Sequence, residues 1–137
     1  MGIESNQPAK SYRDLTTWQS ARVLCLTVYQ LTADFPAQEQ FGLISQMRRA
    51  AVSTPSNIAE GFGRQTAKEK QQFYHHALGS LFELETQADI AAELAFIPDS
   101  RLAELVQEIE SCRRKLLALI KANQRNFPNR KSLIPNR

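Results

Sequence analysis

The sequence predicts an all-α protein, an antiparallel up-down-up-down bundle of four helices in which the second helix is kinked. Four long segments carry apolar residues at every third or fourth position, the spacing that places them on one face of a helix. Glycine and proline number only 5 and 6, which argues against a loop-rich or all-β chain. Amphipathic helices joined by short turns favour a bundle.

The length of 137 residues is about that of one domain. We expect a loose polar arm over residues 1–11, the bundle over residues 12–123, and a basic, extended or mobile tail over residues 124–137. No N-terminal stretch is typical of a signal peptide, and no window is apolar enough to span a membrane. We therefore expect a cytoplasmic protein with no membrane partner, whose two cysteines are reduced core residues.

Prolines bound the first and fourth helices. The first helix should begin near Asp14, carry apolar residues inward as far as Leu31, and end before Pro36. Proline disfavours helical geometry in the residue before it and lacks an amide donor. The fourth helix should follow Pro98 and fade near Asn123. The spacings of its apolar row alternate between three and four, which fits a helix packed at a shallow angle. The row consists of Leu102, Leu105, Ile109, Cys112, Leu116 and Leu119.

The second helix should start near Gln38 and turn Phe41 towards the core. Pro55 lies inside this segment and predicts a kink or a break there. Gly61 and Gly63 fit the end of the helix, because glycine adopts the left-handed conformation of many helix C-termini at little steric cost.

The third helix should open at Thr66, because Thr66 and Glu69 have the spacing of a capping box. One apolar row runs along this helix as far as Ala95. A second, adjoining row consists of Tyr74, Leu78, Phe82 and Ile90. Two rows indicate that the helix contacts two neighbours, or one neighbour and another subunit.

Charge is distributed in blocks along the third and fourth helices. Residues 83–110 carry eight acids and one base, whereas residues 111–137 carry eight bases and no acid. In an antiparallel pair these blocks make one end of the bundle acidic and the other basic. Clustered bases bind nucleic acid partly by releasing its condensed counterions. The alternative is a solvated face whose bases favour the C-terminal end of a helix.

We therefore expect a nucleic-acid-binding surface formed by the basic end, the tail and the arginines that flank Pro55. Such residues contact phosphates and give no sequence specificity. The candidates are Arg48, Arg49, Arg64, Lys68, Lys70, Arg113, Arg114, Lys115, Lys121, Arg125, Arg130 and Lys131.

The sequence shows no catalytic or metal-binding motif. It lacks a phosphate-binding glycine loop, a zinc-protease helix motif and a nucleophile elbow. Glutamate does not stand three residues before His75 or His76, as a di-metal bundle site requires. We expect no cofactor, no metal and no enzymatic activity. An unrecognised nuclease is a third hypothesis, after the two functions given below.

Residues 46–64, with the run Pro-Ser-Asn-Ile-Ala-Glu-Gly over residues 55–61, closely resemble the signature of the bacterial 23S rRNA intervening sequence protein family. Segments around Arg13, Phe35 and Gly79 resemble that family in order and spacing, so the resemblance covers residues 12–122. It implies a homopentamer of four-helix bundles with no known enzymatic activity. A related branch resembles the accessory variability proteins of diversity-generating retroelements, basic pentamers that bind RNA and a reverse transcriptase.

The signature residues Pro55, Ser56, Asn57, Glu60 and Gly61 have a structural interpretation. Ser53, Ser56 and Asn57 can hydrogen-bond the backbone groups that Pro55 leaves unpaired. Glu60 can pair with one of the arginines at positions 48 and 49 or with a neighbouring subunit. The signature would then be explained by its role in the fold and not by ligand binding.

Two functions follow as hypotheses. The first is a non-enzymatic homo-oligomer that binds structured RNA or other nucleic acid through its basic surface. The second is a protein scaffold or accessory subunit, for example of a reverse transcriptase. It would use the acidic end or an exposed apolar strip such as Tyr74, Phe82 and Phe96.

Overall fold

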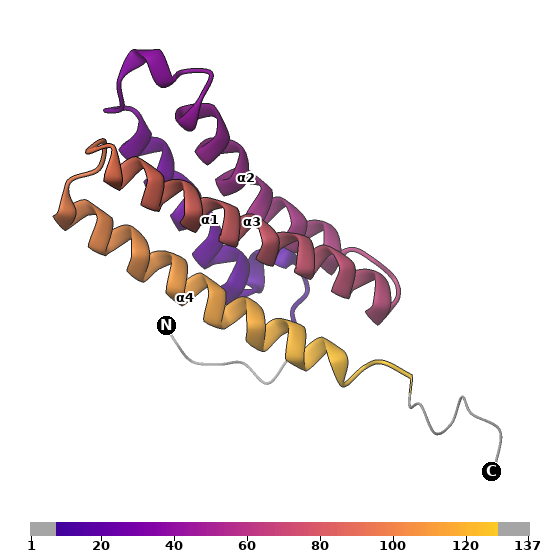
Figure 1. Cartoon of the computed structure of the whole chain (residues 1–137). Coiled ribbons are helices and arrows are strands. Elements are labelled where there is room, and N and C mark those ends of the chain that lie inside the picture. Colours follow the sequence, from indigo (N-terminus) through magenta and orange to yellow (C-terminus); the bar gives the residue numbers. More distant parts are fainter. Residues whose placement is uncertain (1–7, 129–137) are drawn as a thin grey trace, which may run out of the picture.

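The computed structural model describes residues 8–128, and within that range every regular element is helical (Figure 1). The four α-helices are α1 (Thr16–Thr32), α2 (Leu43–Phe62), α3 (Ala67–Glu93) and α4 (Asp99–Gln124). Two short 3-10 helices, η1 (Tyr12–Asp14) and η2 (Ala37–Glu39), precede α1 and α2. The predicted all-α protein with four long helices is confirmed.

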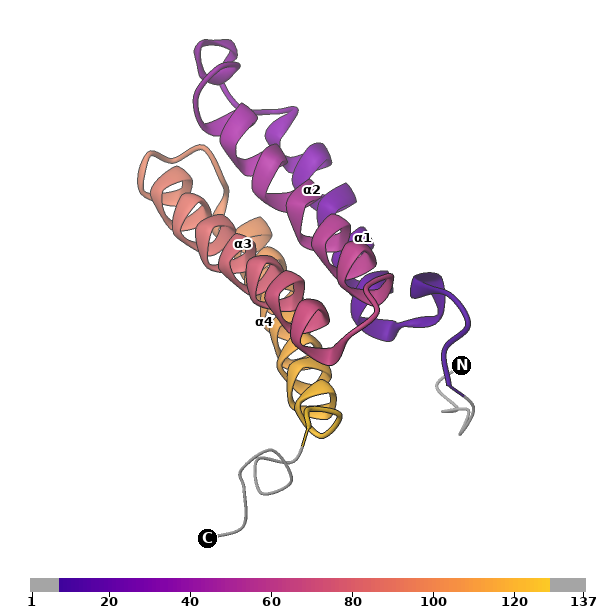
Figure 2. The ribbon, with the colours of Figure 1, turned by 90° about the vertical axis from the view of Figure 1, so that its right-hand side faces the viewer.

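Each long helix packs against two others, because α2 lies between α1 and α3, and α4 lies between α3 and α1. The α1–α2 and α3–α4 connections lie at one end of the molecule, and the α2–α3 connection lies at the other (Figures 1 and 2). We call these the acidic end and the basic end, after the charges described below.

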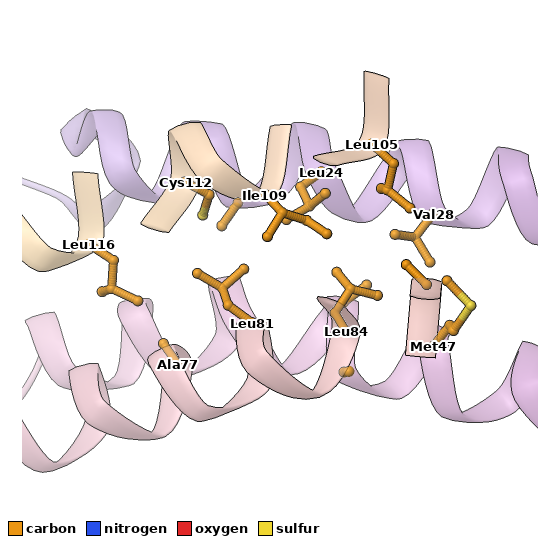
Figure 3. Packing of buried hydrophobic residues seen from close by; sticks show 14 of the residues in the cluster. Leu24, Val28, Met47, Ala77, Leu81, Leu84, Leu105, Ile109, Cys112 and Leu116 are labelled. Carbon is orange, nitrogen blue, oxygen red and sulfur yellow. The ribbon is translucent and has the colours of Figure 1, made fainter. Parts of the chain in front are cut away.

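The apolar rows meet in one core between the four helices (Figure 3). Leu24 and Ile109 face Leu81 and Leu84 across it, and each of these residues is at most 1% exposed. Burial of one such side chain contributes about 1.5–3 kcal/mol to folding. Of the row that the three-and-four spacing predicted in α4, Leu105, Ile109, Cys112 and Leu116 are buried, and Leu102 and Leu119 are partly buried. Ile120 and Asn123 are also buried, although they are not part of that row.

The start of α2 differs from the prediction. The helix begins at Leu43 instead of near Gln38, because η2 and a turn occupy the intervening residues. Phe41 therefore precedes the helix and is 89% exposed, so its predicted core position is wrong. The Glu39 carboxylate accepts a hydrogen bond from the amide of Leu43 (3.0 Å) and so satisfies one of the free donors at this helix start.

The helix continues through Pro55 without a break, and polar side chains at positions 53 and 57 connect it to α3. Asn57 Nδ2 donates to the Ser53 carbonyl oxygen (2.8 Å) and to Ser53 Oγ (2.9 Å). Ser53 Oγ also hydrogen-bonds Ser80 Oγ of α3 at 2.8 Å. The signature thus links the two helices through polar contacts. Asn57 bonds the carbonyl of Ser53, whereas the carbonyl that lacks a helical donor because of Pro55 is that of Ala51, so the predicted role of Asn57 is not the one observed. Ser56 is exposed.

The end of α2 is closed without a left-handed residue. Gly63 has a φ of −80°, and its amide donates to the carbonyl oxygens of Ala59 and Glu60, both at 3.2 Å. No glycine in residues 8–128 has a positive φ, so the predicted left-handed cap is wrong. Gly61 serves helix packing instead, because a Cβ at this position would lie 2.7 Å from Cε1 of Tyr74.

Thr66 caps α3 as predicted, since its Oγ1 accepts a hydrogen bond from the amide of Glu69 (3.1 Å). At the other end the helix stops at Glu93, before Ala95. Ala95 has a φ of 63° and is exposed, so it ends the helix and does not extend the apolar row. The amide of Phe96 then donates to the Ala91 carbonyl oxygen at 2.8 Å, which satisfies one of the free acceptors at this helix end.

Candidate nucleic-acid interface

The structure brings part of the predicted basic surface together where α4 ends beside the start of α3. Asn123 Nδ2 donates to the Ala67 carbonyl oxygen (2.8 Å) and to Gln71 Oε1 (2.7 Å). Gln71 Nε2 in turn donates to the Ile120 carbonyl oxygen (3.1 Å). These buried amides fix the two helices to each other. The predicted cationic residues that lie at this basic end are Arg64, Lys68, Lys70, Lys121 and Arg125.

Two of these five cations are engaged within the protein. Arg64 forms an ion pair with Glu60 at 2.8 Å, and its guanidinium lies 4.5 Å from the ring centroid of Phe73. Lys70 Nζ donates to the Phe62 carbonyl oxygen at 2.7 Å, where a cation complements the C-terminal end of α2. The predicted pairing of Glu60 with an arginine at position 48 or 49 is therefore wrong.

The other three, Lys68, Lys121 and Arg125, are exposed and make no side-chain hydrogen bond within the described residues. Among the described residues none of them takes part in an ion pair. They come from the first turn of α3, from the last turn of α4 and from the residue after α4. Their proximity is a tertiary property, because 57 positions separate residues 68 and 125 in the sequence.

Arg48 lies near the acidic end and links α2 to α1 through hydrogen bonds. Its Nε donates to Thr32 Oγ1 (2.9 Å), and its Nη2 donates to the Tyr29 carbonyl oxygen (3.2 Å). The guanidinium also lies 4.5 Å from the ring centroid of Tyr29. Arg49 is the next residue of α2 and is exposed. The structure does not bring these two arginines to the basic end.

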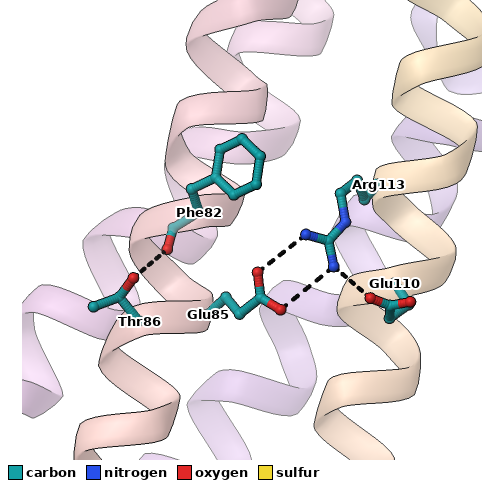
Figure 4. A network of polar contacts seen from close by, with 5 residues as sticks. All are labelled: Phe82, Glu85, Thr86, Glu110 and Arg113. Atoms are coloured by element: carbon teal, nitrogen blue, oxygen red, sulfur yellow. Dashed lines mark hydrogen bonds and ion pairs between the residues drawn. The ribbon is translucent and has the colours of Figure 1, made fainter.

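Arg113 bridges α4 and α3 (Figure 4). Its Nη1 donates to Glu85 Oε1 at 3.1 Å, and its Nη2 bonds Glu110 on the same helix. The hydrogen bond to Glu85, helped by the charges of both carboxylates, raises the pKa of Arg113 despite partial desolvation. Its charge is therefore compensated within the chain.

The neighbouring candidates, Arg114 and Lys115, are exposed. The Lys115 backbone carbonyl accepts a hydrogen bond from Thr17 Oγ1 (3.2 Å), which places this part of α4 beside the start of α1. Both side chains therefore extend the cationic surface away from the basic end along α4. The predicted contacts Arg130 and Lys131 lie outside the described residues.

A groove crosses the basic end between α3 and the residues that follow α4. It is lined by Lys68, Gln71, Gln72, His75, His76 and Phe127. The two histidines are exposed, and Phe127 is half-buried. No local sequence pattern connects these histidines with Phe127, because the groove forms only when α4 packs on α3.

The acidic end contains the last turns of α3 and the first turns of α4. Asp89, Glu93 and Asp99 are exposed there, and Glu104 pairs with Arg101 at 3.7 Å. The block of acids predicted from the sequence is thus placed at the end opposite Lys68.

Exposed apolar residues do not form the strip that the sequence predicted. Phe82 is 50% exposed, but Tyr74 is only 2% exposed, and burial raises the pKa of its hydroxyl. Phe96 packs against Phe35, with ring centroids 5.5 Å apart. Among the exposed apolar residues, Leu26 of α1 and Val52 of α2 line one surface hollow, and Phe82 and Ile90 of α3 line another.

The described residues contain no cluster of histidine, cysteine, aspartate or glutamate that could hold a metal ion. Within the same part of the chain, the helices are too short or too polar to cross a membrane.

The comparisons with known proteins agree with this architecture. The family model of the 23S rRNA-intervening sequence protein matches residues 13–118. No curated protein matches the chain. A solved structure of a protein of unknown function from the S23 ribosomal protein family of Bacteroides thetaiotaomicron VPI-5482 superposes with a TM-score of 0.69. The two chains are 17% identical, and the superposition covers 77% of this chain and 98% of the other.

An identity of 17% shows a common fold and nothing more. The family model, in contrast, spans most of the chain and includes the whole Pro-Ser-Asn-Ile-Ala-Glu-Gly signature. The chain belongs to the 23S rRNA-intervening sequence protein family.

Proposed function

We propose that this protein is a non-enzymatic, cytoplasmic, ring-forming oligomer of up-down-up-down bundles that binds structured RNA or other nucleic acid through its basic end. The observation that carries the proposal is the convergence of Lys68, Lys121 and Arg125 from separate segments onto one exposed surface. Each cation that meets a phosphate adds a salt-dependent increment to affinity. Arg114 and Lys115 extend this surface along α4.

The ring is supported by the two exposed apolar surfaces. Leu26 and Val52 on one surface are 51% and 41% exposed, and Phe82 and Ile90 on the other are 50% and 46% exposed. When two different surfaces of one chain meet between copies, the contact is heterologous and closes into a ring if the rotation permits. Five subunits follow from the family resemblance alone. A ring would repeat a weak cationic surface and raise affinity through avidity, provided that the RNA reaches neighbouring subunits.

The first experiment is a titration of a fluorescent, structured RNA with the full chain at several salt concentrations. We expect a steep negative slope of log affinity against log salt, which counts the phosphates neutralised. The double variant Lys68→Glu, Lys121→Glu should weaken binding and make the slope shallower by about 1 for each phosphate that is no longer neutralised. Equal binding by the variant and the parent would overturn the site.

A matched control has the same change of charge elsewhere. Arg22→Glu together with Arg101→Glu alters α1 and the acidic end and leaves the basic end intact. This control should retain most of the affinity and the parental salt slope. If both double variants lose affinity equally, the protein responds only to its net charge and has no localised RNA site.

A second function, a protein scaffold or accessory subunit such as that of a reverse transcriptase, is favoured by the exposed Phe82 and Ile90. Such a complex would survive nuclease treatment and high salt, because apolar burial does not depend on phosphate contacts. Substitution of both residues by serine should abolish it. Loss of the complex on nuclease treatment would show that RNA, and not apolar contact, holds the two proteins together.

A further inference from the structure

We propose that the groove lined by Lys68, Gln71, Gln72, His75, His76 and Phe127 binds an unpaired nucleobase of the bound nucleic acid. This inference rests on the proposed function, since the RNA supplies the base. It adds a substrate class to the proposed function. Cations alone bind any polyanion, whereas a groove that holds an unpaired base selects single-stranded segments such as loops, bulges and overhangs.

Aromatic rings are the first feature that indicates a base. His75 and His76 of α3 are exposed in the groove, and Phe127 of the segment after α4 is half-buried beside them. The His76 ring is held edge to face against Phe73, with ring centroids 5.9 Å apart. Unpaired bases stack on such rings with little regard to sequence, because every base presents a π face.

The polar lining indicates how a stacked base could be held at its edge. The buried amide of Gln71 is satisfied within the protein by Ile120 and Asn123, so it forms a fixed floor. The exposed amide of Gln72, in contrast, has no hydrogen-bond partner among the described residues. An amide offers both a donor and an acceptor, which suits the edge of any base.

The cations around the groove are placed for the backbone of the same nucleotide strand. Lys68 lines the groove itself, and Lys121 and Arg125 are exposed on the adjoining end of α4. Glu69, the acidic residue next to Lys68 in the sequence, is exposed, and its backbone amide donates a hydrogen bond to Thr66 Oγ1. A phosphate on either side of a stacked base would therefore meet Lys68 or the α4 cations. An apolar peptide would leave these charges and Gln72 without partners.

The test compares two RNA hairpins with equal numbers of phosphates, one blunt and one with an unpaired 3′ overhang. We expect the parental chain to bind the overhang hairpin about tenfold more tightly, the low end of what stacking of one or more bases supplies. Phe127→Leu keeps the apolar volume and removes the π face, so it should abolish the preference without changing the salt slope. Phe127→Tyr keeps a ring and should retain the preference.

Lys68→Gln serves as the phosphate control, because it should weaken binding of both hairpins alike and reduce the salt slope by about 1. If the parental chain binds neither hairpin, the proposed function itself fails, and the base site fails with it. If it binds both hairpins equally, or if Phe127→Leu retains the preference, the base site is overturned while RNA binding stands. Thermal unfolding of each variant shows that the bundle is intact.

Discussion

Gly61 of α2 lies directly against the ring of Tyr74 of α3. A Cβ at position 61 would approach Cε1 of Tyr74 to 2.7 Å and Cδ1 to 2.9 Å, closer than packed carbon atoms allow. The ring cannot move aside freely, because Tyr74 is only 2% exposed. The glycine of the family signature thus allows α2 and α3 to pack closely beside the α2–α3 connection.

Gly61→Ala should therefore destabilise the protein by about 1–3 kcal/mol, the usual effect of overpacking a core. Gly79→Ala is the matched control, because a Cβ there meets no atom within 4 Å. The control should stabilise α3 by up to about 1 kcal/mol, since alanine favours helix more than glycine does. Urea unfolding midpoints measure both effects. Equal midpoints for the two variants would contradict the packing role of Gly61.

Asn123→Ala should destabilise the bundle by about 1–3 kcal/mol, because the buried Gln71 Oε1 and the Ala67 carbonyl oxygen would each lose a hydrogen bond. The control is Asn126→Ala, an exposed residue that should change stability by no more than about 0.5 kcal/mol. Thermal unfolding of both variants provides the measurement. An unchanged midpoint for Asn123→Ala would show that this hydrogen-bonded network does not hold α4 to α3.

Arg113→Ala should lower the stability of the bundle, whereas Arg114→Ala should weaken RNA binding. Arg113 is 19% exposed and pairs with Glu85, so its loss should cost about 1 kcal/mol, less at high salt, and leave RNA affinity nearly unchanged. Arg114 is exposed, and its loss should weaken RNA binding without altering the unfolding midpoint. Both variants require unfolding curves and RNA titrations. The reverse pattern would assign phosphate contact to Arg113.

Cys25 should react with iodoacetamide faster than Cys112 at pH 8. Burial raises the pKa of the Cys112 thiol to about 11 from its ordinary value near 9, and Cys112 is 0% exposed. Burial also raises the pKa of Cys25, but this residue is only half-buried. Mass spectrometry of the labelled peptides measures both rates, and in denaturant the two should become equal. Equal rates in the native protein would contradict the burial of Cys112.

The same raised pKa has a consequence for stability. A thiol whose pKa is higher in the folded state favours folding while it is protonated. Its contribution is complete below pH 9 and is lost as the pH rises through about 11. Cys112→Ala should therefore reduce the loss of stability between these pH values. An identical pH dependence in parent and variant would remove Cys112 as the cause.

Much of the fold could be predicted because it depends on local spacing. The apolar rows identified Leu105, Ile109 and Cys112 as core residues, and the Thr66 side chain marked the start of α3. The errors lie at helix ends. Phe41 continued the apolar spacing but precedes α2, and Ala95 ends α3 in a left-handed conformation that its residue type does not favour.

The candidate site was predictable only as a set of charges. Which cations are free depends on partners far away in the sequence. Arg48 is bound to Thr32, 16 positions earlier, and Arg113 is bound to Glu85, 28 positions earlier. Tertiary contacts thus removed some candidates and left Lys68 among those exposed.

The sequence by itself determined four amphipathic helices, the blocks of acidic and basic residues, and the signature of the family, because each is a property of neighbouring positions along the chain. Only the tertiary structure decided which cations are neutralised and that Gly61 contacts Tyr74. It also decided that His75 and Phe127 share one groove, although 52 positions separate them. The physical reason is that these contacts depend on how the helices pack, and helical periodicity specifies a buried face without specifying its neighbour.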